Sequence, residues 1–164
     1  MKKMIMAVLV LASSFYATVQ AGTGGKTRKA AKKEESVSSI VKESFERQFP
    51  QAQFASWQVL NQHDLYLVRF VDNEVGTIAY VTMEGNVIAV AHNILRENLP
   101  STVNRVLETK YADAEVTEIT ELVLNGELNY FISLVNEKAK ISLKVTGNGV
   151  WSETKREKLS KKAF

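Results

Sequence analysis

At 164 residues, 45% of them hydrophobic, the chain is long enough for one compact domain after any N-terminal extension is subtracted. It has no cysteine, which excludes disulfide bonds and a lipid anchor attached through a cysteine. Residues 22–35 and 153–164 each carry five basic and two acidic side chains, whereas residues 36–152 carry nine basic and fourteen acidic. An acidic body repels phosphate, so nucleic acid is excluded as the main partner, while the basic tails could contact an anionic envelope surface.

The first 21 residues have the three-part layout of a secretory signal peptide. Lys2 and Lys3 precede the apolar run Met4–Ala12, and the stretch that follows ends in small residues at Ala21. The alternative is a membrane anchor, but nine apolar residues, or sixteen with the stretch 13–19, fall short of a span of about 20. We therefore expect cleavage after Ala21 and a periplasmic or secreted bacterial protein.

The stretch AGTGGKT, residues 21–27, resembles a phosphate-binding loop. That loop requires G-x-x-x-x-G-K-[ST] between a strand and a helix, and the first glycine would fall at position 20, which is Gln20. Residues 22–35 contain no large apolar side chain that could offset the entropy of ordering them. We expect a flexible basic linker here, and no nucleotide or other cofactor.

The first structured element is predicted to be an amphipathic helix that begins at Ser36 as its N-cap and stops before Pro50. Apolar residues recur in it at helical spacing. After Pro50 the period changes to that of strands, which we place at residues 52–60, 64–71, 76–83 and 87–93, separated by short turns. The apolar helix positions are Val37, Ile40, Val41, Phe45 and Phe49.

The same order of elements then recurs about 62 residues later. Pro100 and Ser101 mark the start of a second helix, and strands are predicted at residues 114–124, 127–136, 138–146 and 149–154. The apolar stripe of this helix is Val103, Val106, Leu107 and Tyr111.

The repeat predicts an α+β fold of two tandem helix-plus-four-stranded antiparallel meander units (α-β-β-β-β twice), with the helices packed on one sheet face. The units are residues 36–93 and 97–154 of a domain spanning 36–154, and residues 155–164 are a basic C-terminal tail. Each unit has little core of its own, so we expect the two to pack together or to form one extended sheet.

The segments VKESFERQFPQAQFASWQV and DLYLVRFVDNEVGTIAYVTMEGNVI carry a family resemblance. Phe49, Pro50, Ala52 and Trp57 after the first helix, and Tyr66, Val68 and Phe70 in one strand, resemble the PepSY-like domains of exported bacterial proteins. Those domains are similar in fold to the β-lactamase inhibitor proteins. The resemblance implies a binding or inhibitory role toward exported enzymes, and it carries no catalytic motif.

Candidates for chemistry are few. His63 and His92 each stand alone, whereas a zinc site needs three or four converging ligands. Strand alternation would place Glu115 and Glu121 on one face and Glu118 on the other, which is a poor arrangement for an acid–base pair. We therefore predict no catalytic, metal or cofactor site and no enzymatic activity.

Strand alternation also predicts a candidate interaction face. Phe131 falls with Asn129 and Ser133 on the side opposite the apolar residues of its strand, and Lys140, Ser142 and Lys144 fall on the corresponding side of the next strand. An exposed aromatic side chain is a plausible anchor for a protein partner. Cover by the first unit or by a second copy is the alternative for Phe131.

The leading functional hypothesis is thus an exported, non-enzymatic binding module or inhibitor that acts on other envelope or secreted proteins. The alternative is a small-ligand or lipid carrier, which would need an apolar cavity between helix and sheet.

Overall fold

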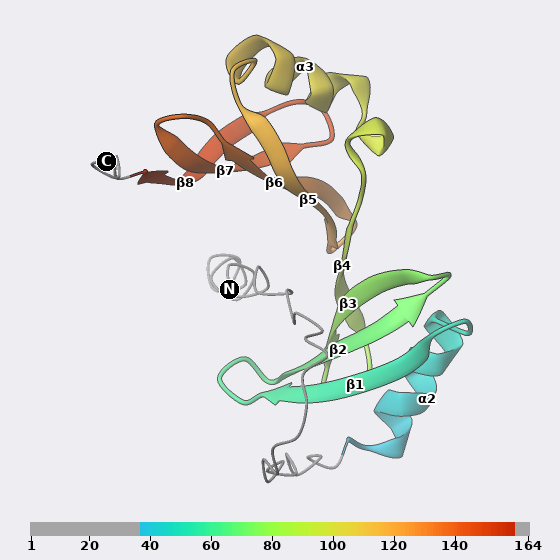
Figure 1. Ribbon diagram of the computed structural model, residues 1–164. Coiled ribbons are helices and arrows are strands. Elements are labelled where there is room, and N and C mark those ends of the chain that lie inside the picture. The colour runs from blue at the N-terminus through green and yellow to red at the C-terminus, as the bar shows by residue number, and fades with distance from the viewer. Residues whose placement is uncertain (1–36, 160–164) are drawn as a thin grey trace, which may run out of the picture. The chain divides into compact units, whose positions relative to one another are not determined.

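A computed structural model gives the structure of the protein and describes residues 37–159, all within the compact unit Lys33–Phe164 (Figure 1). The predicted signal peptide (1–21), the linker (22–35) and the last five residues of the predicted tail lie outside the described residues. In chain order the elements are α2 (Ser39–Gln48), β1 (Gln53–Leu60), β2 (Leu65–Asp72), β3 (Val75–Thr82), β4 (Val87–Asn93), the short 3-10 helix η2 (Arg96–Asn98), α3 (Ser101–Lys110), β5 (Glu115–Leu124), β6 (Glu127–Val135), β7 (Ala139–Thr146) and β8 (Trp151–Lys158).

The eight strands form one antiparallel sheet in which each strand pairs with its neighbours in the sequence, from β1 to β8. The predicted α+β fold of two tandem helix-plus-four-stranded units is therefore wrong. The described chain is mostly β, a single eight-stranded meander with two short α-helices. Strand periodicity predicts which side chains share a face, but it does not predict which strand pairs with the edge of another.

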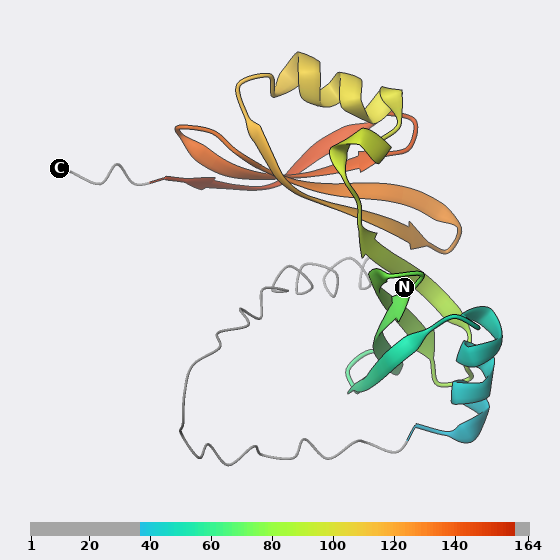
Figure 2. The ribbon, with the colours of Figure 1, turned by 45° about the vertical axis from the view of Figure 1, so that its right-hand side comes forward.

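The decisive pairing is between β4 and β5, on either side of η2 and α3 in the sequence (Figure 2). It runs from Ala89 opposite Leu124 to Asn93 opposite Thr120. The Thr120 hydroxyl donates a hydrogen bond to the Asn93 side chain at 2.9 Å, and the Ile94 N–H donates to the Ile119 carbonyl at 3.0 Å. Because β4 is paired on both sides, the sheet has no edge at its centre.

Helix α2 begins at Ser39, and its N-cap is Ser38, not the predicted Ser36. The Val41 N–H donates to the Ser38 hydroxyl at 3.3 Å. Val41 and Phe45 are buried at 1% and 2% exposure, whereas Ile40 is 69% exposed, so its predicted place in the apolar stripe is wrong. Ile40 precedes Val41 by one position, or about 100° around the helix, which turns it away from the face that packs on the sheet.

Phe45 is the centre of the first hydrophobic core. Its ring centroid lies 5.1 Å from Phe49, 5.2 Å from Trp57 and 4.9 Å from Phe70. Alternate side chains of β2 and β3 complete this core because they project toward α2. The buried members are Val41, Phe45, Tyr66, Val68, Phe70, Ala79 and Val81.

Helix α3 begins at Ser101, directly after Pro100, as predicted. All four residues of its predicted apolar stripe are buried, and they pack on alternate residues of β5, β6 and β7 to form a second core. Its buried members are Leu99, Val103, Val106, Leu107, Tyr111, Ile119, Tyr130, Ile132, Leu134, Ala139, Ile141, Leu143 and Val145.

In each α-helix, one side-chain hydroxyl donates a hydrogen bond to a backbone carbonyl in a turn of the sheet. The Ser44 hydroxyl donates to the Gly85 carbonyl at 2.8 Å, and the Thr102 hydroxyl donates to the Gly147 carbonyl at 2.8 Å. Gly85 has φ +90°, and an added Cβ would lie 3.0 Å from the Ser44 Cβ. A side chain at this turn would therefore push α2 away from the sheet.

The last strand continues to Lys158, although its sequence pattern predicted an end at Thr154. All eight residues of β8 are exposed, and most of them after Ser152 are charged. Charged side chains are a common device that protects the edge strand of a sheet from pairing with other chains. The absence of apolar alternation in an exposed edge strand explains why its end was missed.

Candidate binding face

The candidate interaction face lies on strands β5 to β8, on the side of the sheet opposite α3. Phe131 of β6 lies between Thr120 of β5 and Lys144 of β7, and Ser133 lies opposite Ser142. Residues directly opposite each other in an antiparallel pair project to the same side. Ile132, the neighbour of Phe131, belongs to the core beneath α3, so Phe131 projects to the other side of the sheet. We call this surface the helix-free face, because neither α2 nor α3, the α-helices within residues 37–159, packs on it; it is defined by Thr120, Phe131, Ser133, Lys140, Ser142 and Lys144.

Most of the predicted residues are accessible on this face. Phe131, Ser133, Ser142 and Lys144 are half-buried, and Lys140 is exposed. Asn129 is the exception, because it is only 5% exposed and its side-chain amide donates to the Glu127 carbonyl at 3.3 Å. Asn129 therefore has a local structural role in the strand.

The helix-free face carries charges of both signs, with Lys140 and Lys144 on β7 and Glu115 and Glu118 on β5. Lys155 Nζ lies 2.6 Å from the Glu157 carboxylate at the β8 edge. This hydrogen bond from Lys155, with a weaker contribution from Lys140, lowers the pKa of Glu157 below its ordinary value. Phe131 is thus an aromatic side chain set among hydroxyls, with lysines toward the sheet edge.

Toward the centre of the sheet, the same side carries a row of buried apolar residues that belongs to neither helical core. Leu122 is 1% exposed and lies opposite Ala91, which in turn lies opposite Ile78. Burial raises the pKa of the Tyr80 hydroxyl in this row, and the nearby Arg69 opposes that shift. The row comprises Leu65, Leu67, Ile78, Tyr80, Ala89, Ala91 and Leu122.

This row was not among the predicted surfaces. The signal was present in DLYLVRFV, where apolar residues occupy both alternating sets of positions. A nearly continuous apolar run is typical of a strand that is buried on both faces. β2 accordingly has buried residues toward α2 and buried residues on the opposite side.

The acidic residues of β5 are arranged differently from the prediction. A β-bulge between Val116 and Glu118 inserts one residue, so that Glu118 lies opposite Ser133 and Glu115 lies opposite Val135, both on the side of the helix-free face. Glu121 lies opposite Tyr130, on the helix side. The predicted pairing of Glu115 with Glu121 on one face is therefore wrong.

Among the candidates for chemistry within residues 37–159, His92 lies beside a carboxylate. Its Nε2 lies 3.6 Å from Glu121 Oε1, and Glu121 also accepts a hydrogen bond from Tyr130. Burial, and then the Glu121 carboxylate, raise the pKa of Tyr130. Between residues 37 and 159, no group of three or more His, Asp or Glu side chains converges as a metal site would require.

Comparison with known proteins supports the fold. The sequence matches no protein-family model, and it matches no curated protein. Among solved structures, it is similar to a BLIP-like protein from Bacteroides fragilis with a TM-score of 0.65 and 15% identity, covering 79% of this chain and 93% of the other. A DUF2874 family protein from Bacteroides uniformis gives a TM-score of 0.63 and 12% identity, covering 77% of this chain and 92% of the other.

A third similar structure is a protein of Bacteroides eggerthii with a provisional periplasmic assignment, at a TM-score of 0.63, 16% identity, and coverage of 76% of this chain and 90% of the other. Such identities show the fold alone. The predicted likeness to β-lactamase inhibitor proteins is supported at the level of the fold, whereas the PepSY-like resemblance stays a prediction. In the part of the chain that the structure describes, neither helix has the length and apolar character needed to cross a membrane.

Proposed function

We propose that the chain is an exported, non-enzymatic binding module that contacts other envelope or secreted proteins through its helix-free face. In this proposal the N-terminal segment is a signal peptide cleaved after Ala21, and the product is periplasmic or secreted. The observation that carries the proposal is Phe131, a half-buried aromatic side chain on a sheet face that α3 does not cover.

The surroundings of Phe131 suit a protein contact. Thr120, Ser133 and Ser142 are small and can donate or accept hydrogen bonds, while Lys140 and Lys144 supply positive charge at the side. A central aromatic anchor with a polar rim is the usual composition of a protein–protein binding surface. The BLIP-like and periplasmic neighbours are consistent with a binding protein in general.

The alternative of a small-ligand or lipid carrier has less support. It requires an apolar cavity enclosed between a helix and the sheet. The pocket that the structure describes between α3 and the sheet is lined mainly by polar and basic side chains, with Val106 and Trp151 as its apolar members.

A photo-crosslinking experiment tests the proposal directly. The full-length chain is expressed in its host with p-benzoylphenylalanine in place of Phe131, and in a matched chain the same residue replaces Phe54, which is 84% exposed on β1. We expect a specific protein adduct from position 131 and none of the same mass from position 54. Absence of an adduct at position 131, or the same adducts at both positions, would contradict the proposal.

The variant Phe131→Ala distinguishes binding from packing. If Phe131 is an anchor, the variant loses adduct formation from a second probe at Ser133 while its free energy of unfolding changes little. A loss of about 3–5 kcal/mol of stability, as for a buried phenylalanine, would instead assign Phe131 to the structure.

A further inference from the structure

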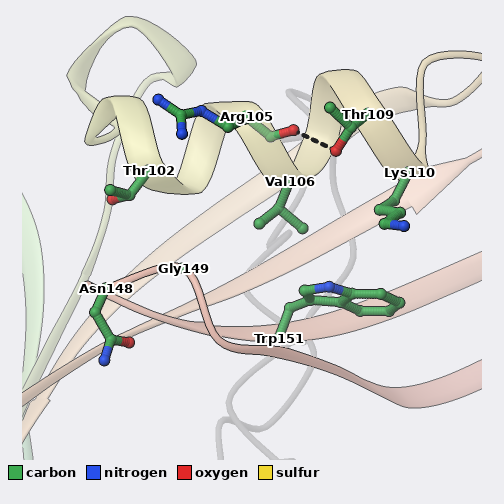
Figure 3. Close-up of a pocket in the computed structure, with 8 residues that line it drawn as sticks. All are labelled: Thr102, Arg105, Val106, Thr109, Lys110, Asn148, Gly149 and Trp151. Carbon is green, nitrogen blue, oxygen red and sulfur yellow. Dashed lines mark hydrogen bonds between the residues drawn. The ribbon is translucent and has the colours of Figure 1, made fainter.

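A groove lies between α3 and the turn that joins β7 to β8 (Figure 3). The strand pairing places it on the side of the sheet opposite Phe131. Its volume is about 290 Å³. We call it the α3 groove, defined by Arg105, Val106, Thr109, Lys110, Gly149 and Trp151. Ligand pockets for drug-sized molecules begin at about 300 Å³, so this volume suits a smaller molecule or one residue of a peptide.

One wall of the groove is a single stripe of α3. Positions 102, 106 and 109 share one side of the helix, and Arg105 and Lys110 lie on the two opposite edges of this stripe, about 140° apart. Val106 is buried and makes the wall apolar at its base, whereas Arg105, Thr109 and Lys110 are exposed at the rim. The wall thus combines an apolar base with a cationic upper edge.

The opposite wall is the indole of Trp151, which is 39% exposed. Its ring meets the Tyr111 ring edge-on, with centroids 5.7 Å apart at 87°. The Tyr111 hydroxyl donates to Glu153 at 2.8 Å, and Arg156 holds the same carboxylate with two hydrogen bonds of 2.6 and 2.9 Å. The contacts that link Trp151 to Tyr111, Glu153 and Arg156 hold one side of the indole in place. The exposed part of the ring can serve as an aromatic platform.

The groove is held at a fixed width. Thr102 donates a hydrogen bond to the Gly147 carbonyl, and an added Cβ on Gly149 would lie 3.3 Å from the Thr102 carbonyl oxygen. The turn therefore lies directly against the helix at one end of the groove. A ligand would meet walls that are already in place, which reduces the entropy cost of binding.

The cations at the rim are available for a ligand. Across residues 37–159, neither the Arg105 side chain nor the Lys110 side chain forms an ion pair or a hydrogen bond. The Glu153 carboxylate, which lies on the same side of the sheet, is already bound by Arg156 and Tyr111. In Figure 3 the Lys110 side chain is directed from the helix toward the Trp151 indole, while Arg105 extends outward along the rim.

From this geometry we infer that the α3 groove binds an aromatic carboxylate, with the flat ring on Trp151 and Val106 and the carboxylate at Lys110. A flat apolar body matches the platform, and an anion matches the unpaired Lys110 cation. The carboxylate could belong to a free small acid or to the C-terminal phenylalanine of a peptide. This site is independent of the helix-free face and does not rest on the proposed function.

The test follows the indole N–H signals of the full-length protein by NMR during titration with 3-phenylpropionate, with Trp151→Phe used to assign the two signals. We expect the Trp151 signal to shift to saturation, with a dissociation constant on the order of 1 mM or below for so small a ligand, and the Trp57 signal to stay in place. The neutral isostere 3-phenylpropanamide should shift neither. A second arm uses N-acetyl-Gly-Gly-Phe with a free or an amidated C-terminus, and saturation by the free peptide alone would assign the ligand to peptide ends.

Two variants distinguish binding at the α3 groove from a general effect of removing one positive charge. Lys110→Gln should weaken binding at least fivefold while leaving the unfolding midpoint unchanged, and Lys42→Gln, the exposed lysine of α2, should bind as the wild type does. The inference is overturned if neither acid saturates the Trp151 signal, if the amide binds equally well, or if Lys42→Gln weakens binding as much as Lys110→Gln.

Discussion

At the scale of single residues, the first core depends on a few aromatic rings. Phe45 contacts three other rings, and two of these contacts, to Trp57 and Phe70, have the edge-to-face geometry that aromatic pairs prefer. Val41 and Phe45 are the only residues of α2 that are fully buried. Most of the buried contact between α2 and the sheet is therefore made by Phe45 and Val41.

Replacement of Phe45 by alanine should accordingly cost about 3–5 kcal/mol of unfolding free energy, because it removes buried area and leaves a cavity. The matched control is Phe54→Ala, whose side chain is 84% exposed. We expect that control to stay within about 0.5 kcal/mol of the wild type. Urea denaturation measures both, and equal losses in the two variants would contradict this account of the core.

The Glu153 carboxylate should make stability depend on acid pH. Hydrogen bonds from Arg156, and then from Tyr111, lower the pKa of Glu153 below its ordinary value of 4.5. At acid pH the unfolded chain binds a proton at this position before the folded chain does, so protonation favours unfolding. The contribution of Glu153 is complete above about pH 4.5 and is lost as the pH falls through the lower pKa of the folded state.

The variant Glu153→Gln cannot titrate, so it should lose less stability than the wild type between about pH 6 and about pH 3. Some acid dependence should remain, because the pKa values of Glu84 and Glu157 are also lowered. Tyr111→Phe keeps the Arg156 bonds and should fall between the two proteins. Urea midpoints across the pH series are the measurement, and identical slopes for wild type and Glu153→Gln would refute the role of this carboxylate.

At the scale of elements, close contact between helix and turn explains where glycine is required. Gly85 and Gly126 both have positive φ, at +90° and +80°. An added Cβ would lie 3.0 Å from Ser44 at Gly85, but it would meet nothing within 4 Å at Gly126. Both turns therefore share the positive backbone φ, but only the turn at Gly85 is in steric contact with α2.

Both Gly85→Ala and Gly126→Ala should lose about 1–2 kcal/mol to the left-handed backbone conformation. Gly85→Ala should lose on the order of 1 kcal/mol more, since α2 must shift to admit the methyl group. Thermal or urea unfolding of the two variants gives the difference. Equal destabilisation would show that the approach of α2 to this turn does not contribute.

The sequence predicted the positions of the strands better than their assembly. Hydrophobic alternation placed Phe131 and Ile132 on opposite sides of β6, as the structure has them. It did not predict the bulge that moves Glu115 relative to Glu118 and Glu121, because a bulge adds a residue without a distinctive residue type here. It also did not predict the burial of Asn129, whose side-chain amide donates to the Glu127 carbonyl.

At the scale of the whole described molecule, the two hydrophobic cores are separate, but the strands of both belong to one continuous hydrogen-bonded sheet. Neither core contains residues from both helices. Five residue pairs join β4 to β5, and Ala91 and Leu122 lie opposite each other across this junction at 4% and 1% exposure. If the second half unfolded alone, it would leave β4 with an unpaired edge and expose the apolar row of residues beside it.

We therefore expect the two halves to unfold in one transition. Each half contains one of the two tryptophans, Trp57 or Trp151, so Trp151→Phe and Trp57→Phe create reporters of the first and second halves. Leu143→Ala, a fully buried change in the second core, should lower stability by about 2–5 kcal/mol. In a cooperative sheet, the urea midpoint reported by Trp57 falls together with that reported by Trp151. If only the Trp151 transition moves, the β4–β5 junction does not couple the halves, and they unfold independently although their strands are paired.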